Sequence, residues 1–175
     1  MNFAFAFPAG QWPMWLALGA GVIAALYAAS AAGVRIELIV RGVCALRPGV
    51  KGLSENIRVI SVVGRFLEHS RIWYFHDDGA QTLYLSSADW MDRNLFRRVE
   101  IGFPVLDSKL KTRVLKEGLR PYLTDDSQAW LMDADGGYQR RRSRGKPGKS
   151  AQRMLLRALS MDNSQASAGK QRKAK

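Results

Sequence analysis

The chain of 175 residues contains two histidines, and one of them stands beside other residues that can bind phosphate. In the stretch EHSR, His69 and Arg71 lie two positions apart, just before an apolar run rich in β-forming residues. Side chains two apart on an extended segment point to the same side, so both can face one ligand. A guanidinium binds phosphate oxygens in pairs, and an imidazole can attack phosphorus or protonate a leaving oxygen. The pair therefore predicts a phosphate site.

A second polar cluster follows the next β-rich run, in the stretch SSADWMDRN. Ser86 and Ser87 offer hydroxyl donors, Asn94 offers an amide, and Asp89 could orient the His69 imidazole. The alternative is that these side chains only satisfy backbone groups at the end of a strand. We favour a supporting role in the phosphate site. His76 lies in the expected hairpin turn HDDGAQ, where an exposed residue without function is the simpler interpretation.

Arginine also follows an earlier strand. The run VRIELIV, after a glycine-terminated helix, is typical of a buried parallel strand, and Arg41 lies at its carboxyl end, where α/β sheets bind ligands. A solvated strand end is the alternative. Arg98 and Glu100 alternate along RRVEIGF, which predicts that they share one face of a strand, either as an ion pair or as the lining of a phosphate channel. We favour the channel. The loop LRPGVKGLSEN lacks the Gly-Lys-Ser/Thr ending of a P-loop.

These residues need a mixed α/β scaffold to bring them together. IRVISVVGRFLEHS predicts a short strand that passes into a helical turn ending at His69. RIWYF and TLYLSS predict a hairpin, RRVEIGFPVLD another strand, and AWLMDADGGYQRR a final hairpin. DSKLKTRVLKEGLRPYL predicts an amphipathic helix that is capped by Asp107 or Ser108 and closes near Pro121. The expected fold is an α/β domain over residues 22–142.

Charge is distributed unevenly along the chain. The formal net charge is +12, but twelve basic residues and a single acidic one follow Tyr138, so the rest of the chain is nearly neutral. Residues 143–175 are therefore expected to form a basic tail, partly helical or disordered, that attracts polyanions. Cys44 is the sole cysteine, which excludes a disulfide framework and fits a reducing compartment.

The amino-terminal stretch is free of charge from Asn2 to Val34. Its segment MWLALGAGVIAALYAASAAG is long enough to span a bilayer, but it consists mostly of alanine and glycine, and no basic residue precedes it. We expect a helix that enters the sheet of a soluble domain, with residues 1–21 as an apolar extension unrelated to the fold or associated with a membrane. The alternative is a tether in which Met14–Ala32 spans the bilayer and docks the domain on a partner chain.

The motifs together resemble a known family. His69 and Arg71 with Ser86, Ser87 and Asp89 resemble one half of the phospholipase D motif, in which His-x-Lys is followed by Gly-Ser-x-Asn, with Arg71 in place of the lysine. The stretches LIVRG, LRPG, LSENI, GRFLEHSR and LSSADWMDRN, with GKPGKSAQRMLLRAL near the end, resemble the C-terminal domain of bacterial polyphosphate kinase. The resemblance runs from about residue 24 to about residue 159.

The resemblance implies a phospholipase D-like mixed sheet flanked by helices, and reversible transfer of the terminal phosphoryl group of ATP onto polyphosphate. It places the ATP-binding arginine on Arg41 and an ATP-binding histidine, proposed as general acid, on His69. The phosphorylated histidine and the Mg²⁺ ligands of the family have no counterpart here, so we expect a truncated or split chain that is inactive alone. The expected supporting residues are Arg71, Ser86, Ser87, Asp89, Asn94, Arg98 and Glu100.

The expected partners are ATP or ADP, inorganic polyphosphate, and a complementary domain or chain that carries the phosphohistidine, with Mg²⁺ as cofactor. Homo-oligomerisation and association with a membrane are left open. We expect a cytoplasmic protein, with a peripheral position at the inner membrane as the alternative. A non-catalytic module that binds polyphosphate or nucleic acid through its basic residues is the competing function.

Overall fold

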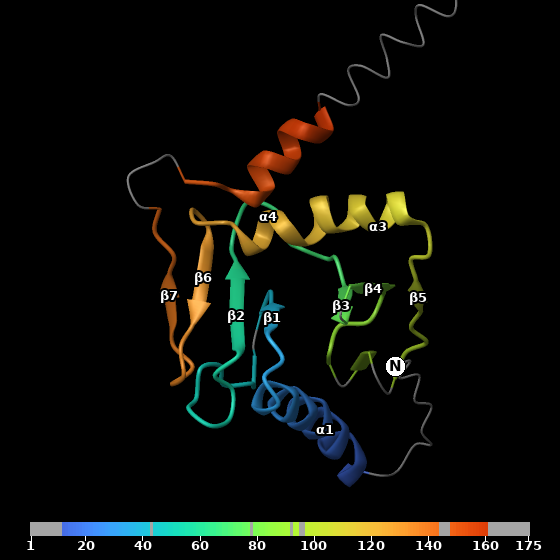
Figure 1. Ribbon diagram of the computed structural model, residues 1–175, viewed down its shortest axis with the longest axis vertical. Helices are drawn as coiled ribbons and strands as arrows, with labels where there is room; N and C mark the ends of the chain where they lie inside the picture. The colour runs from blue at the N-terminus through green and yellow to red at the C-terminus, as the bar shows by residue number, and fades with distance from the viewer. Residues whose placement is uncertain are drawn as a thin grey trace, which may run out of the picture.

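The computed structural model describes residues 12–160 except 43, 78, 92, 95–96 and 144–147, and it does not describe the side chains of residues 12–20 and 77. Two sheets lie side by side, with helices above and below them (Figure 1). The elements are α1 (Trp12–Ala31), β1 (Ile36–Ile39), β2 (Ile57–Val62), β3 (Ile72–Asp77), β4 (Ala80–Ser86), β5 (Gly102–Pro104), α3 (Ser108–Val114), the π-helical turn η1 (Leu115–Leu119), α4 (Arg120–Leu123), β6 (Ala129–Met132) and β7 (Tyr138–Arg140).

The first sheet has the strand order β1-β2-β6-β7, and its core lies on both faces of β2. β1 runs parallel to β2, with Ile36 opposite Ile57, and β6 and β7 are antiparallel additions. On one face of β2, Val59 packs with α1, and on the other Ile60 packs with α4 and Ala151 of the C-terminal segment. The mixed α/β fold with helices on both sides of a sheet is confirmed.

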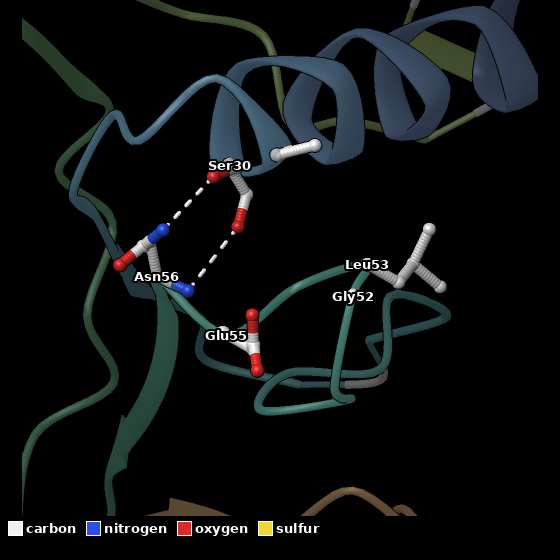
Figure 2. Close-up of a pocket in the computed structure, with 6 residues that line it drawn as sticks. Ser30, Gly52, Leu53, Glu55 and Asn56 are labelled. Carbon is white, nitrogen blue, oxygen red and sulfur yellow. Dashed lines mark hydrogen bonds between the residues drawn. The ribbon is translucent and has the colours of Figure 1, made fainter.

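Helix α1 enters the sheet through its last turns. Ile23 and Tyr27 recur at helical spacing and pack against the core next to β2, as the sequence predicts. Figure 2 shows how the end of the helix is fixed: Asn56 donates from Nδ2 to the Ser30 carbonyl (2.9 Å) and from its backbone N–H to Ser30 Oγ (3.2 Å). The shallow hollow there lies at the opposite ends of β1 and β2 from Arg41. Among the described helices, none combines the length and hydropathy needed to cross a bilayer.

The second sheet has the order β3-β4-β5, and the predicted hairpin forms. β3 and β4 pair from Ile72 opposite Leu85 to Asp77 opposite Ala80. β5 is shorter than expected, because the ladder ends where Ser87 Oγ takes the place of a backbone carbonyl and accepts the N–H of Ile101 (2.9 Å).

Two local predictions are wrong. Arg98 and Glu100 precede β5 and lie outside any strand, so the alternation argument does not apply to them. Residues 63–71 form bends and irregular backbone instead of a helical turn. Both polar backbone groups of Phe66 in this segment bond to the distant side chain of Gln152, which the local sequence does not reveal.

The helix after β5 is confirmed with its cap. Asp107 has extended backbone geometry and its side chain accepts from the N–H of Leu110 at 2.8 Å, which is the expected N-cap bond. The helical path continues through η1 and α4 to Leu123. The π-helical turn sits where Gly118 meets Ile72 of β3, since a Cβ at Gly118 would lie 2.4 Å from Ile72 Cδ1.

The packed body extends past Arg142, the predicted end of the domain. Residues 151–160 form a helix, seen beyond α4 in Figure 1, and Ala151 at its start is fully buried. Asp125, also fully buried, accepts the N–H of Ala151 at 2.8 Å through Oδ2. Its Oδ1 accepts the backbone N–H groups of residues 127–129. The other parts of the predicted basic tail, residues 144–147 and 161–175, lie outside the described residues.

Candidate functional site

The carboxyl ends of β1 and β2 meet at one edge of the first sheet, as parallel pairing requires. Arg41 follows β1, and the segment that contains His69 follows β2. The Arg41 guanidinium donates from Nη1 to the backbone carbonyl of Glu68, the residue before His69. His69 itself is exposed. The structure therefore places the two predicted ATP-binding residues at the same sheet edge.

Asp89 joins the two arginines of this edge. The hairpin brings Arg71, just before β3, beside Asp89, just after β4. Arg71 donates from Nε and Nη2 to the two carboxylate oxygens at 2.9 and 3.0 Å, which is bidentate geometry. Arg41 Nη2 lies 3.5 Å from Asp89 Oδ2. Among the described residues no hydrogen bond joins Asp89 to the His69 imidazole, and both carboxylate oxygens face arginines instead.

The ion pair fixes the charge state of its members. The hydrogen bond from Arg71 lowers the pKa of Asp89, and the nearby guanidinium charges lower it further. The same hydrogen bond raises the pKa of Arg71. One carboxylate thus serves two guanidiniums, and the Arg41 and Arg71 side chains remain 34% and 23% exposed. The partly exposed guanidiniums can therefore still bind an anionic ligand.

A second cluster surrounds Glu100. Its carboxylate accepts from the Ser87 hydroxyl and from Asn94 Nδ2 (2.6 Å). These two hydrogen bonds, Ser87 first, lower the pKa of Glu100, with Arg98 and Arg71 adding a smaller electrostatic effect. Asn94 is only 4% exposed and acts as a support. Glu100 is therefore held as an anion near the arginines.

The remaining predicted residues divide into near and distant ones. Ser86 Oγ accepts the N–H of Ala88 at 3.1 Å, which is a local turn and matches the structural alternative. Arg98 is exposed, and its charge helps to lower the pKa of the nearby Glu100 carboxylate. His76 is exposed at the far end of β3 from Arg71, consistent with the interpretation of a residue outside the site.

Three residues that sequence reasoning missed hold the segment before His69. Glu68 accepts from the Tyr122 hydroxyl at 2.8 Å and from Gln152 Nε2 at 2.6 Å. The sequence could have indicated Glu68, because it is an acidic residue directly before His69. The roles of Tyr122 and Gln152 depend on contacts across 54 and 84 residues of sequence, which no local pattern shows.

The described residues show no metal centre. No group of three or more His, Cys, Asp or Glu side chains among them could hold a metal ion. The two carboxylates of the site, Asp89 and Glu100, are engaged by arginine, hydroxyl and amide donors. This donor set does not suit Mg²⁺, which takes oxygen ligands in near-octahedral geometry.

Comparison with known proteins gives the family. The sequence model of the family described as polyphosphate kinase C-terminal domain 2 matches residues 17–152. A polyphosphate kinase of Burkholderia ambifaria (strain MC40-6) is 67% identical over 135 residues, which are 77% of this chain and 20% of the relative. A polyphosphate kinase of Paraburkholderia phytofirmans is 63% identical over the same length. The chain thus spans about a fifth of the length of these curated relatives.

A solved structure agrees in fold. The crystal structure of polyphosphate kinase from Porphyromonas gingivalis superposes with a TM-score of 0.75 at 41% sequence identity, covering 83% of this chain and 22% of that one. This likeness is in keeping with the phospholipase D-like fold expected from the motifs. Because the family model matches most of the chain, this protein belongs to the polyphosphate kinase C-terminal domain 2 family.

Proposed function

We propose that this domain forms one half of a polyphosphate kinase site, which transfers the terminal phosphoryl group of ATP reversibly onto polyphosphate. The observation that carries the proposal is the shared sheet edge, where Arg41 contacts the residue before His69 and Asp89 joins Arg41 to Arg71. Because the chain matches about a fifth of its relatives, the phosphorylated histidine comes from another domain, in the same polypeptide or a separate one. This domain alone is then inactive.

In this proposal the residues of the chain divide the work. Arg41 and Arg71 bind phosphate oxygens of the nucleotide through their free N–H groups. His69 donates a proton to the oxygen that bridges the β- and γ-phosphates as its bond to the γ-phosphorus breaks. As that bond breaks, the phosphorus bonds to an imidazole nitrogen of the second domain, and ADP leaves with the proton. A terminal oxygen of polyphosphate next bonds to the phosphorus as the bond to the imidazole nitrogen breaks, and His69 regains a proton from solvent. Asp89 keeps the two guanidiniums in place.

Mg²⁺ is part of the proposal only through the second domain. Its ligands are expected there, since the carboxylates on this sheet edge are engaged by other donors. Mg²⁺ would neutralise phosphate charge when bound. None of the steps assigned to Arg41, Arg71 or His69 passes through it.

The test compares two histidine variants in a two-domain enzyme. The chain is fused to, or mixed with, the remaining part of a Burkholderia polyphosphate kinase, and polyphosphate synthesis and ATP affinity are measured. An acid acts in the transition state, so His69→Gln should lower turnover by about 10²–10⁴-fold and change ATP binding little. His76→Gln, the matched control on the exposed end of β3, should be nearly silent.

Arg41 should behave differently from His69. A phosphate clamp acts in the ground state as well, so Arg41→Gln should weaken ATP affinity together with turnover. Equal effects of the two histidine variants, or near-normal turnover in His69→Gln, would remove His69 from the chemistry.

A non-catalytic polyanion-binding module is the second candidate. It is favoured by the basic excess after Tyr138, which any polyphosphate or nucleic acid would attract without turnover. Under this alternative, the chain binds polyphosphate with a strong salt dependence, and no phosphoryl transfer appears when the second domain is supplied.

A further inference from the structure

The backbone that carries His69 is irregular, yet it is tightly hydrogen-bonded. Residues 63–71 connect β2 to β3 and belong to neither sheet. A segment of this kind has no ladder to fix it, so its conformation depends on bonds from elsewhere. At Phe66 and Glu68 those bonds come from the side chains of residues 41, 122 and 152, on three different parts of the fold. The two ends of the segment, Val63 and Arg71, bond to the backbone at the ends of neighbouring strands.

Gln152 acts on the segment as a neighbouring strand would. Its Oε1 accepts the backbone N–H of Phe66 at 3.0 Å, and its Nε2 donates to the carbonyl of the same residue at 2.7 Å. Nε2 also donates to Glu68 Oε1 at 2.6 Å. Gln152 is only 7% exposed, so these bonds form away from water. One carboxamide therefore satisfies both backbone groups of Phe66 and one oxygen of Glu68.

Glycine at position 64 gives this side chain its room. A Cβ at Gly64 would lie 2.3 Å from Gln152 Oε1 and 2.7 Å from Gln152 Cδ, closer than real Cβ contacts allow. Any larger residue at position 64 would push the carboxamide away from Phe66. The close approach of the C-terminal helix to the segment therefore depends on glycine at position 64 as well as on Gln152.

Glu68 is held at all three of its oxygens. Tyr122, 8% exposed on α4, donates its hydroxyl to Glu68 Oε2 at 2.8 Å. Burial, and then the neighbouring Glu68 carboxylate, raise the pKa of the Tyr122 phenol, so it stays a donor. Gln152 holds Oε1, and Arg41 donates to the Glu68 carbonyl. The peptide that joins Glu68 to His69 is consequently fixed relative to Arg41.

We propose that Gln152 and Tyr122, acting through Glu68, are positioning residues for His69 and Arg41. This inference rests on the proposed function, in which His69 must reach a bridging phosphate oxygen held by Arg41. The geometry gives the C-terminal helix a direct part in the site, since its first turn supplies Gln152. Misplacing a reacting group by about 1 Å can lower turnover by about 100-fold, so a hydrogen-bonded support of this kind matters.

The first measurement needs no activity and uses the 175-residue chain. Gln152→Glu keeps the shape of the side chain, but as an anion it cannot donate to Phe66 or Glu68 and it repels the Glu68 carboxylate. The segment should therefore move away from position 152, and the Phe66 N–H should lose its acceptor. We expect hydrogen–deuterium exchange of the Phe66 and neighbouring amides to rise at least about tenfold, with the β2 amides unchanged. Ser150→Ala is the matched control at the start of the same helix, because Ser150 is buried and its hydroxyl bonds to Gln128 and to the N–H of Arg153, not to the segment.

The second measurement uses the two-domain enzyme. Gln152→Glu should lower kcat by about tenfold or more with the KM for ATP changed less than about threefold, whereas Ser150→Ala should leave both near normal. Tyr122→Phe, which removes only the hydroxyl, should lower kcat by a smaller factor, about threefold. If Gln152→Glu fails to fold, Tyr122→Phe tests the positioning role by itself.

The two proposals fail in different ways. Normal kcat in Gln152→Glu and Tyr122→Phe, or equal losses in Ser150→Ala, would overturn the positioning role while leaving His69 in place. Unchanged exchange at Phe66 in Gln152→Glu would overturn it as well. Normal turnover in His69→Gln would instead overturn the proposed function.

Discussion

At the scale of single residues, Asp89 is the member of the site with the most consequences for charge. It bonds bidentately to Arg71 and approaches Arg41, and these contacts hold its pKa below the ordinary value of 3.8. A group with a depressed pKa in the folded state stabilises the fold above its unfolded pKa. That contribution is lost as the pH falls through the folded pKa.

Asp89→Asn should therefore lower the free energy of unfolding by about 1–2 kcal/mol at neutral pH. The difference between wild type and variant should stay constant down to about pH 5. It should shrink as the pH falls below about 4, because Asp89 of the unfolded chain then takes up a proton while Asp89 of the folded protein, with its lowered pKa, is still ionised. Urea unfolding at a series of pH values measures this directly.

A double-mutant cycle with Arg71→Gln isolates the pair. Removing Asp89 should cost less in the Arg71→Gln background, because the bidentate bonds are already gone. A constant difference between Asp89→Asn and wild type down to pH 2 would show that the ion pair does not contribute to stability.

At the scale of elements, much of the framework could be predicted because local rules govern it. The hairpin of β3 and β4 follows from Asp-Gly turn chemistry between β-rich runs, and the helix start follows from the cap at Asp107. The edge position of Arg41 follows from strand direction. These features depend on few residues that are close in sequence.

The parts that could not be predicted depend on distant contacts. The segment before His69 was expected to be helical, but the N–H and the carbonyl of its Phe66 bond to Gln152, far away in the sequence. The strand containing Arg98 and Glu100 was expected because alternation resembles a strand, but Ser87 intercepts the ladder at Ile101. In both places a side chain takes the position of a backbone hydrogen-bond partner. No local residue pattern indicates which side chain in the sequence does so.

The turn η1 offers a test of element packing at Gly118. Glycine is about 1 kcal/mol less favourable than alanine in a helix interior, so helix propensity alone predicts that Gly118→Ala stabilises the protein. Here, however, the added Cβ would lie 2.4 Å from Ile72 Cδ1, and overpacking typically costs about 1–3 kcal/mol. We expect Gly118→Ala to destabilise by about 1 kcal/mol in thermal or urea unfolding.

Ile72→Val supplies the matched background, since valine lacks the Cδ1 atom in question. In that background Gly118→Ala should be neutral or stabilising, because the remaining near contacts, Val114 Cγ1 at 3.7 Å and Cγ1 of residue 72 at 3.8 Å, are ordinary. If Gly118→Ala costs the same in both backgrounds, the π-helical turn itself and not the contact with Ile72 requires glycine.

At the scale of the whole molecule, the basic carboxyl-terminal region, residues 151–175, has two parts with different roles. The helix of residues 151–160 is built into the body through Ala151, whose N–H bonds to the buried Asp125 and whose side chain is fully covered. Residues 161–175 follow it and carry four basic residues and one acidic one, Asp162. Two truncations should therefore distinguish the contribution of this region to folding from its contribution to the attraction of anions.

Truncation after Ser160 should leave the free energy of unfolding within about 0.5 kcal/mol of the full chain, whereas truncation after Lys149 removes Ala151 and Gln152 and should cost about 3 kcal/mol or more. The shorter deletion should still weaken polyphosphate binding at low salt and flatten its salt dependence, because fewer counterions are released from the ligand. Replacing Lys170, Arg172, Lys173 and Lys175 by glutamine keeps the length and should reproduce that change. An unchanged salt slope in both proteins would mean that the folded body, through Arg41 and Arg71, supplies the attraction by itself.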